Sequence, residues 1–331
     1  MNEPWHQLVL TSTSAKTATK QTVIQSLWSG YGEIIRVKLD DGNVPTCIVK
    51  HIKPPNGSPS QSQHPRGWNS DLGHKRKLRS YEVEIAWYRD WSQRCDDHCR
   101  VPQCYSAEHC DNEQVIVLED IDASGFPLRK NRLSIKQTLP CLSWLAHFHA
   151  KFLNETPSKL WPTGTYWHLA TRPEEFSAMR NGKIKSAAFD IDRCLNQSRF
   201  QSLVHGDAKV ANFCFSSNKG PVAAVDFQYV GGGCGMKDVA YFLSSCLSED
   251  ECEHHETQLL DYYFATLKEA INTYQKNIDV TALEKEWRML YSIAWADFYR
   301  FLLGWMPTHQ KINRYTKKMA NQALQQLTHT V

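Results

Sequence analysis

The stretch that decides the fold of this chain lies near its middle. It reads Val204-His205-Gly206-Asp207-Ala208-Lys209-Val210-Ala211-Asn212-Phe213, and Val225-Asp226-Phe227 follows a short distance later. Phosphoryl transfer from ATP needs a carboxylate that accepts a hydroxyl proton, and an amide and a second carboxylate that hold Mg²⁺. The spacing therefore predicts a phosphoryl-transfer site, with Asp207 as the base and with Asn212 and Asp226 as the metal ligands.

The residues around this trio predict how it is assembled. Residues 212–215 alternate as a short strand, and residues 222–225 form the next strand after a turn. Such a hairpin would place Asn212 beside Asp226, where both side chains can bind one metal ion. Lys209 is close enough to the base in sequence to reach the γ-phosphate. The alternative is an ordinary hairpin whose polar residues face water.

The same stretch resembles the "Brenner" motif of the aminoglycoside phosphotransferase and choline kinase group. Similarity to ecdysteroid-kinase-like phosphotransferases of that group extends from about Gly30 to Trp305 and includes Trp68-Asn69 and residues 76–84. The resemblance implies an α+β, two-lobed, protein-kinase-like fold. A small antiparallel-sheet lobe at 1–120 would bind nucleotide, and a larger, mainly helical lobe at 121–331 would carry the catalytic loop and the substrate pocket.

In the N-terminal lobe, the strand at 45–50 ends on Lys50. A kinase of this fold needs a lysine there to hold the α- and β-phosphates, and it needs a glutamate on the next helix to pair with that lysine. We expect Lys50 and Glu84 in these roles. Lys53 and Glu82 are the alternatives, and an exposed surface position is the simpler explanation for any of them.

The remaining nucleotide contacts are expected from backbone groups. Gly30 and Gly32 interrupt an alternating pattern, which predicts a hairpin whose amides cover the phosphates, although a plain β-hairpin explains the pattern as well. In the resembled fold, the apolar strand that ends at Glu119 leads into a hinge. Main-chain groups between Glu119 and Ile121 would then hydrogen-bond adenine.

Residues 54–79 are predicted to form a mobile insertion, because their first part is rich in Pro, Gly, Ser, Gln and Asn. A helix capped by Ser80 is expected to follow it over 81–94. In the second half, residues 135–154 carry a strong amphipathic pattern. His205 is expected to brace the catalytic loop. Asp238 either braces that loop too or caps the helix that it begins.

A long aromatic helix is predicted over 287–305. Tyr291, Trp295 and Asp297 are candidates for contacts with the substrate, since aromatic rings hold flat rings or cations and a carboxylate within an apolar helix needs a partner. Core packing is the alternative for the aromatic residues.

Composition narrows the class of protein. The chain has 331 residues and a net charge of +3, which is too small to argue for nucleic acid. No run approaches ~18 apolar residues, so no membrane span is predicted, and the first twenty residues lack the apolar core of a secretory signal. The 11 cysteines are expected to be reduced thiols of a cytoplasmic protein.

The sequence therefore favours an ATP- and Mg²⁺-dependent kinase whose acceptor is a hydroxyl of a small metabolite. Gly206 stands where protein kinases have an arginine, and Gln228 stands where they have a glycine, which argues against a protein substrate. Two alternatives remain. One is a catalytically silent nucleotide-binding regulator, and the other is a zinc-stapled interaction module built on the Cys and His residues between Cys95 and Cys110.

Overall fold

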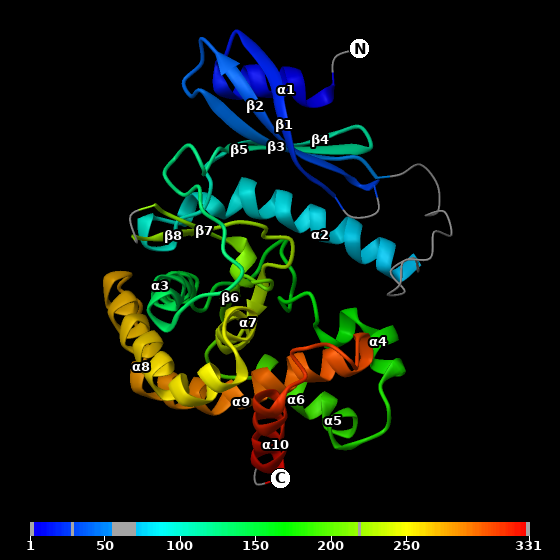
Figure 1. The fold of residues 1–331 in the computed structure, drawn as a ribbon, viewed down its shortest axis with the longest axis vertical. Helices are drawn as coiled ribbons and strands as arrows, with labels where there is room; N and C mark the ends of the chain where they lie inside the picture. Colours follow the sequence, from blue (N-terminus) through cyan, green and yellow to red (C-terminus); the bar gives the residue numbers. More distant parts are fainter. Residues whose placement is uncertain (1–2, 28–29, 55–70, 218–219, 329–331) are drawn as a thin grey trace. The chain divides into compact units, whose positions relative to one another are not determined.

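The structure is a computed structural model, and it describes residues 3–27, 30–54, 71–217 and 220–328. The chain divides into two units, each with its own packing (Figure 1). The first comprises Met1–Leu128 with Cys214–Lys219 and Ala223–Val225, and the second comprises Arg129–Phe213, Gly220–Val222 and Asp226–Val331. The first unit holds an antiparallel sheet and the second is mostly helical, which confirms the predicted α+β class.

The elements follow in this order. In the first unit these are α1 (Pro4–Thr13), β1 (Thr17–Ser26), β2 (Gly32–Asp40), β3 (Thr46–Ile52), α2 (Asp71–Asp90), the 3₁₀ turns η2 (Ser92–Arg94) and η3 (Asp97–Cys99), β4 (Cys104–Cys110) and β5 (Glu113–Glu119). There follow α3 (Ile135–Lys151), η4 (Leu169–Thr171), α4 (Pro173–Ala178), α5 (Lys183–Ser186), α6 (Ala188–Asn196), β6 (Ser202–Val204), η5 (Val210–Asn212), β7 (Phe213–Phe215), β8 (Val222–Ala224), β9 (Gly231–Gly233), α7 (Met236–Cys246), α8 (Glu249–Thr273), α9 (Val280–Trp305) and α10 (Arg314–Thr328).

The sheet of the first unit has the strand order β1-β2-β3-β5-β4, and each neighbouring pair is antiparallel. Strand β3 is central, since Lys50 lies opposite Ile34 of β2 and Ile116 of β5. Side chains alternate between the two faces of a strand. Cys47 and Val49 therefore point to one face, and Lys50, between Val49 and His51, points to the other.

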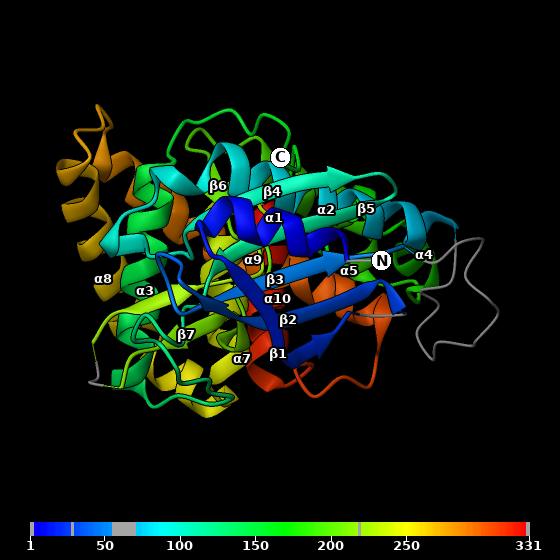
Figure 2. The same cartoon turned by 90° about the horizontal axis from the view of Figure 1, so that it is seen from above.

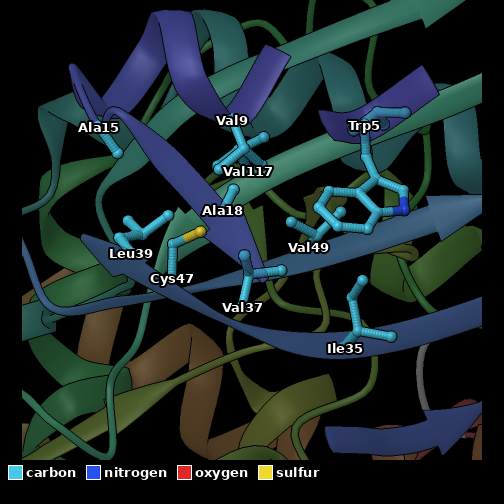
Figure 3. Packing of buried hydrophobic residues seen from close by; sticks show 11 residues of the cluster. Trp5, Val9, Ala15, Ala18, Ile35, Val37, Leu39, Cys47, Val49 and Val117 are labelled. Carbon is cyan, nitrogen blue, oxygen red and sulfur yellow. The ribbon is translucent and has the colours of Figure 1, made fainter. Parts of the chain in front are cut away.

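Helix α1 covers the face to which Cys47 and Val49 point (Figure 2). Its residues Trp5 and Val9 are one helical turn apart, so both reach the sheet. They join a buried cluster with alternate residues of β2, β3 and β5 (Figure 3). Burial of this apolar surface is the main stabilising contribution to the unit. Helix α2 lies on the opposite face of the sheet, where its residue Glu84 contacts Lys50 of β3.

Helix α2 is longer than the sequence predicts. It begins at Asp71, so residues 71–79 of the predicted mobile insertion are helical, and it ends at Asp90 rather than at Arg94. Ser80 is not a cap but lies inside the helix, where its hydroxyl bonds the carbonyl of Lys77 (2.7 Å). Residues 55–70, which include Trp68-Asn69, lie outside the described residues.

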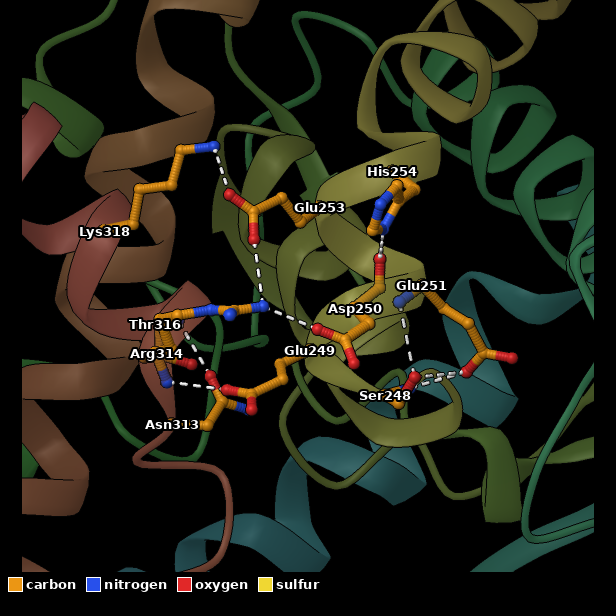
Figure 4. Close-up of polar contacts among 10 residues, drawn as sticks. All are labelled: Ser248, Glu249, Asp250, Glu251, Glu253, His254, Asn313, Arg314, Thr316 and Lys318. Atoms are coloured by element: carbon orange, nitrogen blue, oxygen red, sulfur yellow. Dashed lines mark hydrogen bonds and ion pairs between the residues drawn. The ribbon is translucent and has the colours of Figure 1, made fainter.

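The second unit is built around α3 and α9. Helix α3 packs against α8, and α9 packs against α4, α6, α7 and α10. Capping boxes at Ser134 and Ser248 define the starts of α3 and α8. The starts of α8 and α10 are joined by ion pairs, since Arg314 lies 2.5 Å from Asp250 and Lys318 lies 3.0 Å from Glu253 (Figure 4). Within the described residues, no helix is both long and apolar enough to cross a membrane.

Candidate active site

The predicted catalytic loop, from His205 to Asn212, follows directly from strand β6 of the second unit. Its backbone is held by Asp238 of α7, whose Oδ2 accepts a hydrogen bond from the amide of His205 (2.6 Å) and whose Oδ1 accepts one from the amide of Gly206 (3.0 Å). The ring of His149, on α3, contacts the same carboxylate (Nε2 to Oδ2, 3.1 Å). Asp238 is fully buried and does not occupy the N-cap of α7, which is Gly235. It therefore braces the loop, as one of the two sequence interpretations has it.

Gly206 is required by the shape of this loop. Its φ is +80°, and a Cβ at this position would lie 2.0 Å from the carbonyl oxygen of Tyr229. Only glycine accepts both the left-handed backbone and the close approach. The ring nitrogen Nδ1 of His205 accepts a hydrogen bond from the amide of Asp207 (3.3 Å). The backbone of Asp207 is thus fixed from both sides.

The two carboxylate oxygens of Asp207 have different surroundings. Oδ2 accepts hydrogen bonds from Nζ of Lys209 (2.9 Å) and from Nδ2 of Asn212 (3.2 Å). Oδ1 is buried and accepts no hydrogen bond of normal geometry among the described residues. The phenol of Tyr241 interacts with the same carboxylate as a donor, which adds to the effect of burial in raising the pKa of the tyrosine. A buried carboxylate oxygen without a partner is costly. One oxygen is therefore held in place by the protein, and the other is available to a ligand.

Asn212 and Asp226 present oxygens suited to a hard cation. Nδ2 of Asn212 donates to the backbone carbonyl of Asp207 (2.8 Å), which leaves its Oδ1 for other contacts. Asp226 follows the two-stranded β7-β8 sheet and has a φ of +70°, a strained backbone conformation for a residue other than glycine. Nε2 of Gln228 donates to Oδ1 of Asp226 (2.7 Å). Gln228, which departs from the protein-kinase pattern, here orients the predicted metal ligand.

Lys209 carries a firmly held positive charge. Burial alone would lower the pKa of its ammonium, but the charges of Asp207 and Asp226 outweigh this effect and the pKa is raised. The lysine therefore stays charged throughout the neutral range. Its side chain is 39% exposed, so the ammonium can contact a ligand while it remains paired with Asp207.

In the first unit, Lys50 and Glu84 form a buried ion pair. Nζ of Lys50 lies 2.6 Å from Oε2 of Glu84, and the two side chains are 6% and 2% exposed. The alternatives are both at the surface: Lys53 pairs with Glu113 and is 64% exposed, and Glu82 pairs with Arg79 and is 50% exposed. The lysine and glutamate that the sequence prefers are thus the pair that meets on the α2 side of the sheet.

A comparison with known protein families identifies the family of this chain. The model of the ecdysteroid kinase-like family matches residues 75–157 and 167–276, which together make up more than half of the chain. The chain belongs to the ecdysteroid kinase-like family. The matched range includes Glu84, the whole of the predicted catalytic loop, Asp226 and Asp238.

Individual relatives of this ecdysteroid kinase-like chain are distant. An uncharacterized kinase-like protein of Caenorhabditis elegans is 26% identical over 215 residues, which cover 57% of each chain. Among solved structures, a protein of Ralstonia eutropha, provisionally described as an aminoglycoside phosphotransferase, has a TM-score of 0.51 at 12% identity, with 97% of this chain and 94% of that chain covered. An amicoumacin kinase solved with AMP-PNP and Ca²⁺ has a TM-score of 0.48 at 13% identity, with 98% and 93% covered. The first of these structures supports the kinase-like fold.

The backbone groups expected to contact nucleotide lie in the first unit. Gly32 has a φ of +122°, and a Cβ there would meet the carbonyl oxygen of His51 at 2.0 Å, so the turn between β1 and β2 needs glycine. Gly30 also has a positive φ, of +76°. In the expected hinge, the Glu119 amide donates to Gln103 (2.9 Å) and the Ile121 carbonyl accepts from Phe126 (3.1 Å). The contact of this segment with adenine therefore stays a prediction.

The three residues predicted to contact substrate, Asp297, Trp295 and Tyr291, are all buried. Asp297 pairs with Arg300 (2.8 Å) and accepts a hydrogen bond from Nε1 of Trp167 (3.0 Å), and all three side chains are buried. Trp295 packs edge-on against Tyr291 and Tyr315 in the core. These contacts are those of core residues, and a substrate contact of Asp297, Trp295 or Tyr291 stays a prediction.

The cysteine cluster does not form a metal centre in the described part of the chain. No group of three or more His, Cys, Asp or Glu side chains there is arranged to hold a metal ion. Cys95, Cys99, Cys104 and Cys110 are all free thiols, and burial raises the pKa of Cys104 to about 12. The zinc-stapled module therefore has no support in these residues.

Three further residues affected by the charge of Asp207 belong to no sequence motif, so the sequence alone does not identify them. Burial raises the pKa values of Tyr166 and Tyr241, and the charge of Asp207 adds to both shifts, which places the two phenols in its neighbourhood. Burial lowers the pKa of Lys311, in the segment between α9 and α10, and the charge of Asp207 partly offsets this effect. These residues come from three distant segments, so only the fold brings them together.

Proposed function

We propose that this chain is an ATP- and Mg²⁺-dependent phosphotransferase that moves the γ-phosphoryl group of ATP to a hydroxyl group of a small molecule. The observation that supports the proposal most directly is that the two carboxylate oxygens of Asp207 have different surroundings. One of its oxygens is fixed by Lys209 and Asn212, and the other is buried and accepts no hydrogen bond of normal geometry among the described residues. That second oxygen is suited to accept the hydrogen bond of an acceptor hydroxyl.

The proposed reaction follows from this geometry. The acceptor hydroxyl donates its hydrogen bond to Oδ1 of Asp207, which orients the oxygen and takes up its proton as transfer proceeds. A bond forms between the acceptor oxygen and the γ-phosphorus, and the bond from that phosphorus to the β,γ-bridging oxygen breaks, so that ADP leaves. Lys209 would steady the negative charge on the transferring group.

The other predicted site residues are assigned to the nucleotide and the metal. Lys50, fixed by Glu84, would hold the α- and β-phosphates, and backbone amides near Gly30 and Gly32 would contact the phosphates as well. Asn212 and Asp226 fit Mg²⁺, because each offers an oxygen and Mg²⁺ completes its shell with water and phosphate oxygens. The ion would neutralise charge that develops on the phosphates.

The proposal is tested by incubating the protein with MgATP and a panel of hydroxylated compounds, and by scoring ADP formation for each. We expect at least one acceptor to raise ADP production well above the rate without acceptor, and we expect a phosphorylated product by mass spectrometry. If the protein binds ATP in a calorimeter but no acceptor raises ADP formation, it is a nucleotide-binding protein without transferase activity.

A further inference from the structure

Lys311 is a half-buried lysine near the catalytic carboxylate that the proposed reaction does not use. It lies in the segment that joins α9 to α10, beyond the range matched by the family model. Its Nζ lies 4.7 Å from the ring centre of Tyr241 and 5.3 Å from that of Phe298. Aromatic faces hold a cation in place without neutralising it.

The ammonium of Lys311 has few polar contacts among the residues that the structure describes. Its hydrogen-bond contact in the described part of the chain is a long one, to Oγ of Ser244 (3.4 Å), and no carboxylate there lies within ion-pair distance. Burial lowers the pKa of the group to about 8, although the charge of Asp207 acts in the opposite direction. A half-buried ammonium with three donors and one weak acceptor is unfavourable unless a ligand or water completes its shell.

Asp207 and Lys311 are linked by Tyr241. The ring of Tyr241 contacts the ammonium of Lys311. Burial is the main reason why the pKa of the Tyr241 phenol is raised, and its interaction with the carboxylate of Asp207, as a hydrogen-bond donor, adds to the shift. Among the described residues, the second unit alone therefore provides, around one tyrosine, a carboxylate oxygen that accepts no hydrogen bond of normal geometry and an ammonium without a counter-ion. Together they match a ligand with a hydroxyl group and an anionic group.

We propose that Lys311 is a specificity-determining residue that binds an anionic group of the acceptor, so that the acceptor is a hydroxylated acid and not an amino alcohol. The inference rests on the proposed function, because it takes Asp207 as the group that orients the acceptor hydroxyl. An acceptor with an ammonium group near its hydroxyl would be repelled by Lys311 and Lys209. An acceptor with a carboxylate or phosphate group would pair with Lys311 in surroundings of low polarity, where a charge-assisted hydrogen bond is strong.

The test uses three benzyl alcohols that share one skeleton and differ in the para substituent: carboxylate, carboxamide or aminomethyl. Binding of each to the full-length protein is measured by calorimetry or by ligand-observed NMR, without nucleotide, so that the result does not depend on turnover. We expect the carboxylate to bind about tenfold more tightly than the carboxamide, and the aminomethyl compound to bind most weakly.

The matched variants are Lys311→Met, which keeps the aliphatic stem over the rings, and Lys317→Met, which removes an exposed lysine of α10. Lys311→Met should abolish the preference for the carboxylate and leave carboxamide binding unchanged, whereas Lys317→Met should behave as wild type. Lys311→Arg should restore part of the preference. Circular dichroism checks that each variant is folded.

Three results would overturn the proposal. In the first, wild-type protein does not prefer the carboxylate, whether all three compounds bind alike or none binds. In the second, the preference survives in Lys311→Met. In the third, Lys311→Met weakens MgATP binding instead, which would assign the lysine to the nucleotide. Failure of the proposed function is a separate result, because it appears as absence of phosphoryl transfer whatever the binding preference.

Discussion

Nζ of Lys209 lies 2.9 Å from Oδ2 of Asp207, while Oδ1 of the same carboxylate accepts no hydrogen bond of normal geometry among the described residues. Lys209 thus holds one oxygen of the proposed base and leaves the other to the acceptor. Its own charge is secure, because its pKa is raised by Asp207 and Asp226 despite burial. The lysine therefore has two roles, in orienting the base and in contacting the transferring phosphoryl group.

Substitution Lys209→Met is expected to lower kcat by about 10²-fold, because it removes both the support of Oδ2 and a charge near the transition state. The KM for the acceptor should change much less. Steady-state kinetics with an acceptor from the panel measure both parameters. Lys209→Arg, which keeps the charge, should retain more activity than Lys209→Met, and equal loss in the two variants would contradict the role of the charge.

The brace at Asp238 gives a second prediction. Asp238→Asn can accept from only one of the amides of His205 and Gly206 with its remaining carbonyl oxygen, and its NH₂ group would face the other amide. We expect a loss of about 1–3 kcal/mol in stability and faster hydrogen exchange at these two amides. Asp250→Asn is the control, since it removes an exposed pair with Arg314 that should contribute little. Unchanged exchange in Asp238→Asn would contradict the brace.

The buried pair in the first unit can be tested by a double-mutant cycle. Lys50→Met leaves Glu84 buried beside an apolar group, and this is expected to cost about 3–5 kcal/mol. The double variant Lys50→Met/Glu84→Met should recover much of that loss, because neither charge is then buried alone. Thermal unfolding of the two single variants and the double variant measures the coupling. A double variant as unstable as the sum of the single variants would show that the two side chains do not depend on each other.

Much of this could be predicted from the sequence because it depends on local spacing. Alternation along β3 places Lys50 on the face opposite Val49, and the interval from Asn212 to Asp226 matches one short two-stranded sheet. The start of α2 was missed because its first turns are polar and charged, without the apolar period that marks a helix. These first turns of α2 have no strong local signal for a helix.

Other features depend on contacts between distant segments. The local sequence makes Asp297 a candidate for a substrate contact, but one of its partners, Trp167, is 130 positions away and does not show in any local pattern. The two interpretations of Asp238 could be separated only by the position of His205 and Gly206 in space. Lys311 lies in an irregular segment without a motif, and its contact with Tyr241 comes from the packing of the helical unit.

The lowered pKa of Lys311 predicts how acceptor binding depends on pH. Burial lowers this pKa to about 8, so the ammonium is charged below that pH and neutral above it. Affinity for a hydroxylated acid should be constant near neutral pH and should fall as pH rises through 8, by about tenfold in total, until the lysine is neutral in the complex as well. Of the groups that act on Lys311, Lys209 and Cys246 have raised pKa values, as does Tyr241, and therefore keep their charge states in this range.

This prediction is checked by measuring the binding of the para-carboxylate benzyl alcohol by calorimetry from about pH 6 to about pH 10, a range that includes the titration of Lys311. The fall should disappear in Lys311→Arg, because a guanidinium stays charged throughout. A wild-type profile without a fall near pH 8, or the same fall in Lys311→Arg, would assign the titration to a different group.

The central claim is that Asp207 orients the acceptor hydroxyl and takes its proton. The direct measurement compares Asp207→Asn with wild type in two assays on the same preparations: phosphoryl transfer to the panel acceptor, and MgATP binding by calorimetry. The account predicts that transfer falls by about 10³-fold or more while the affinity for MgATP stays within about threefold. Turnover close to wild type in Asp207→Asn would contradict it.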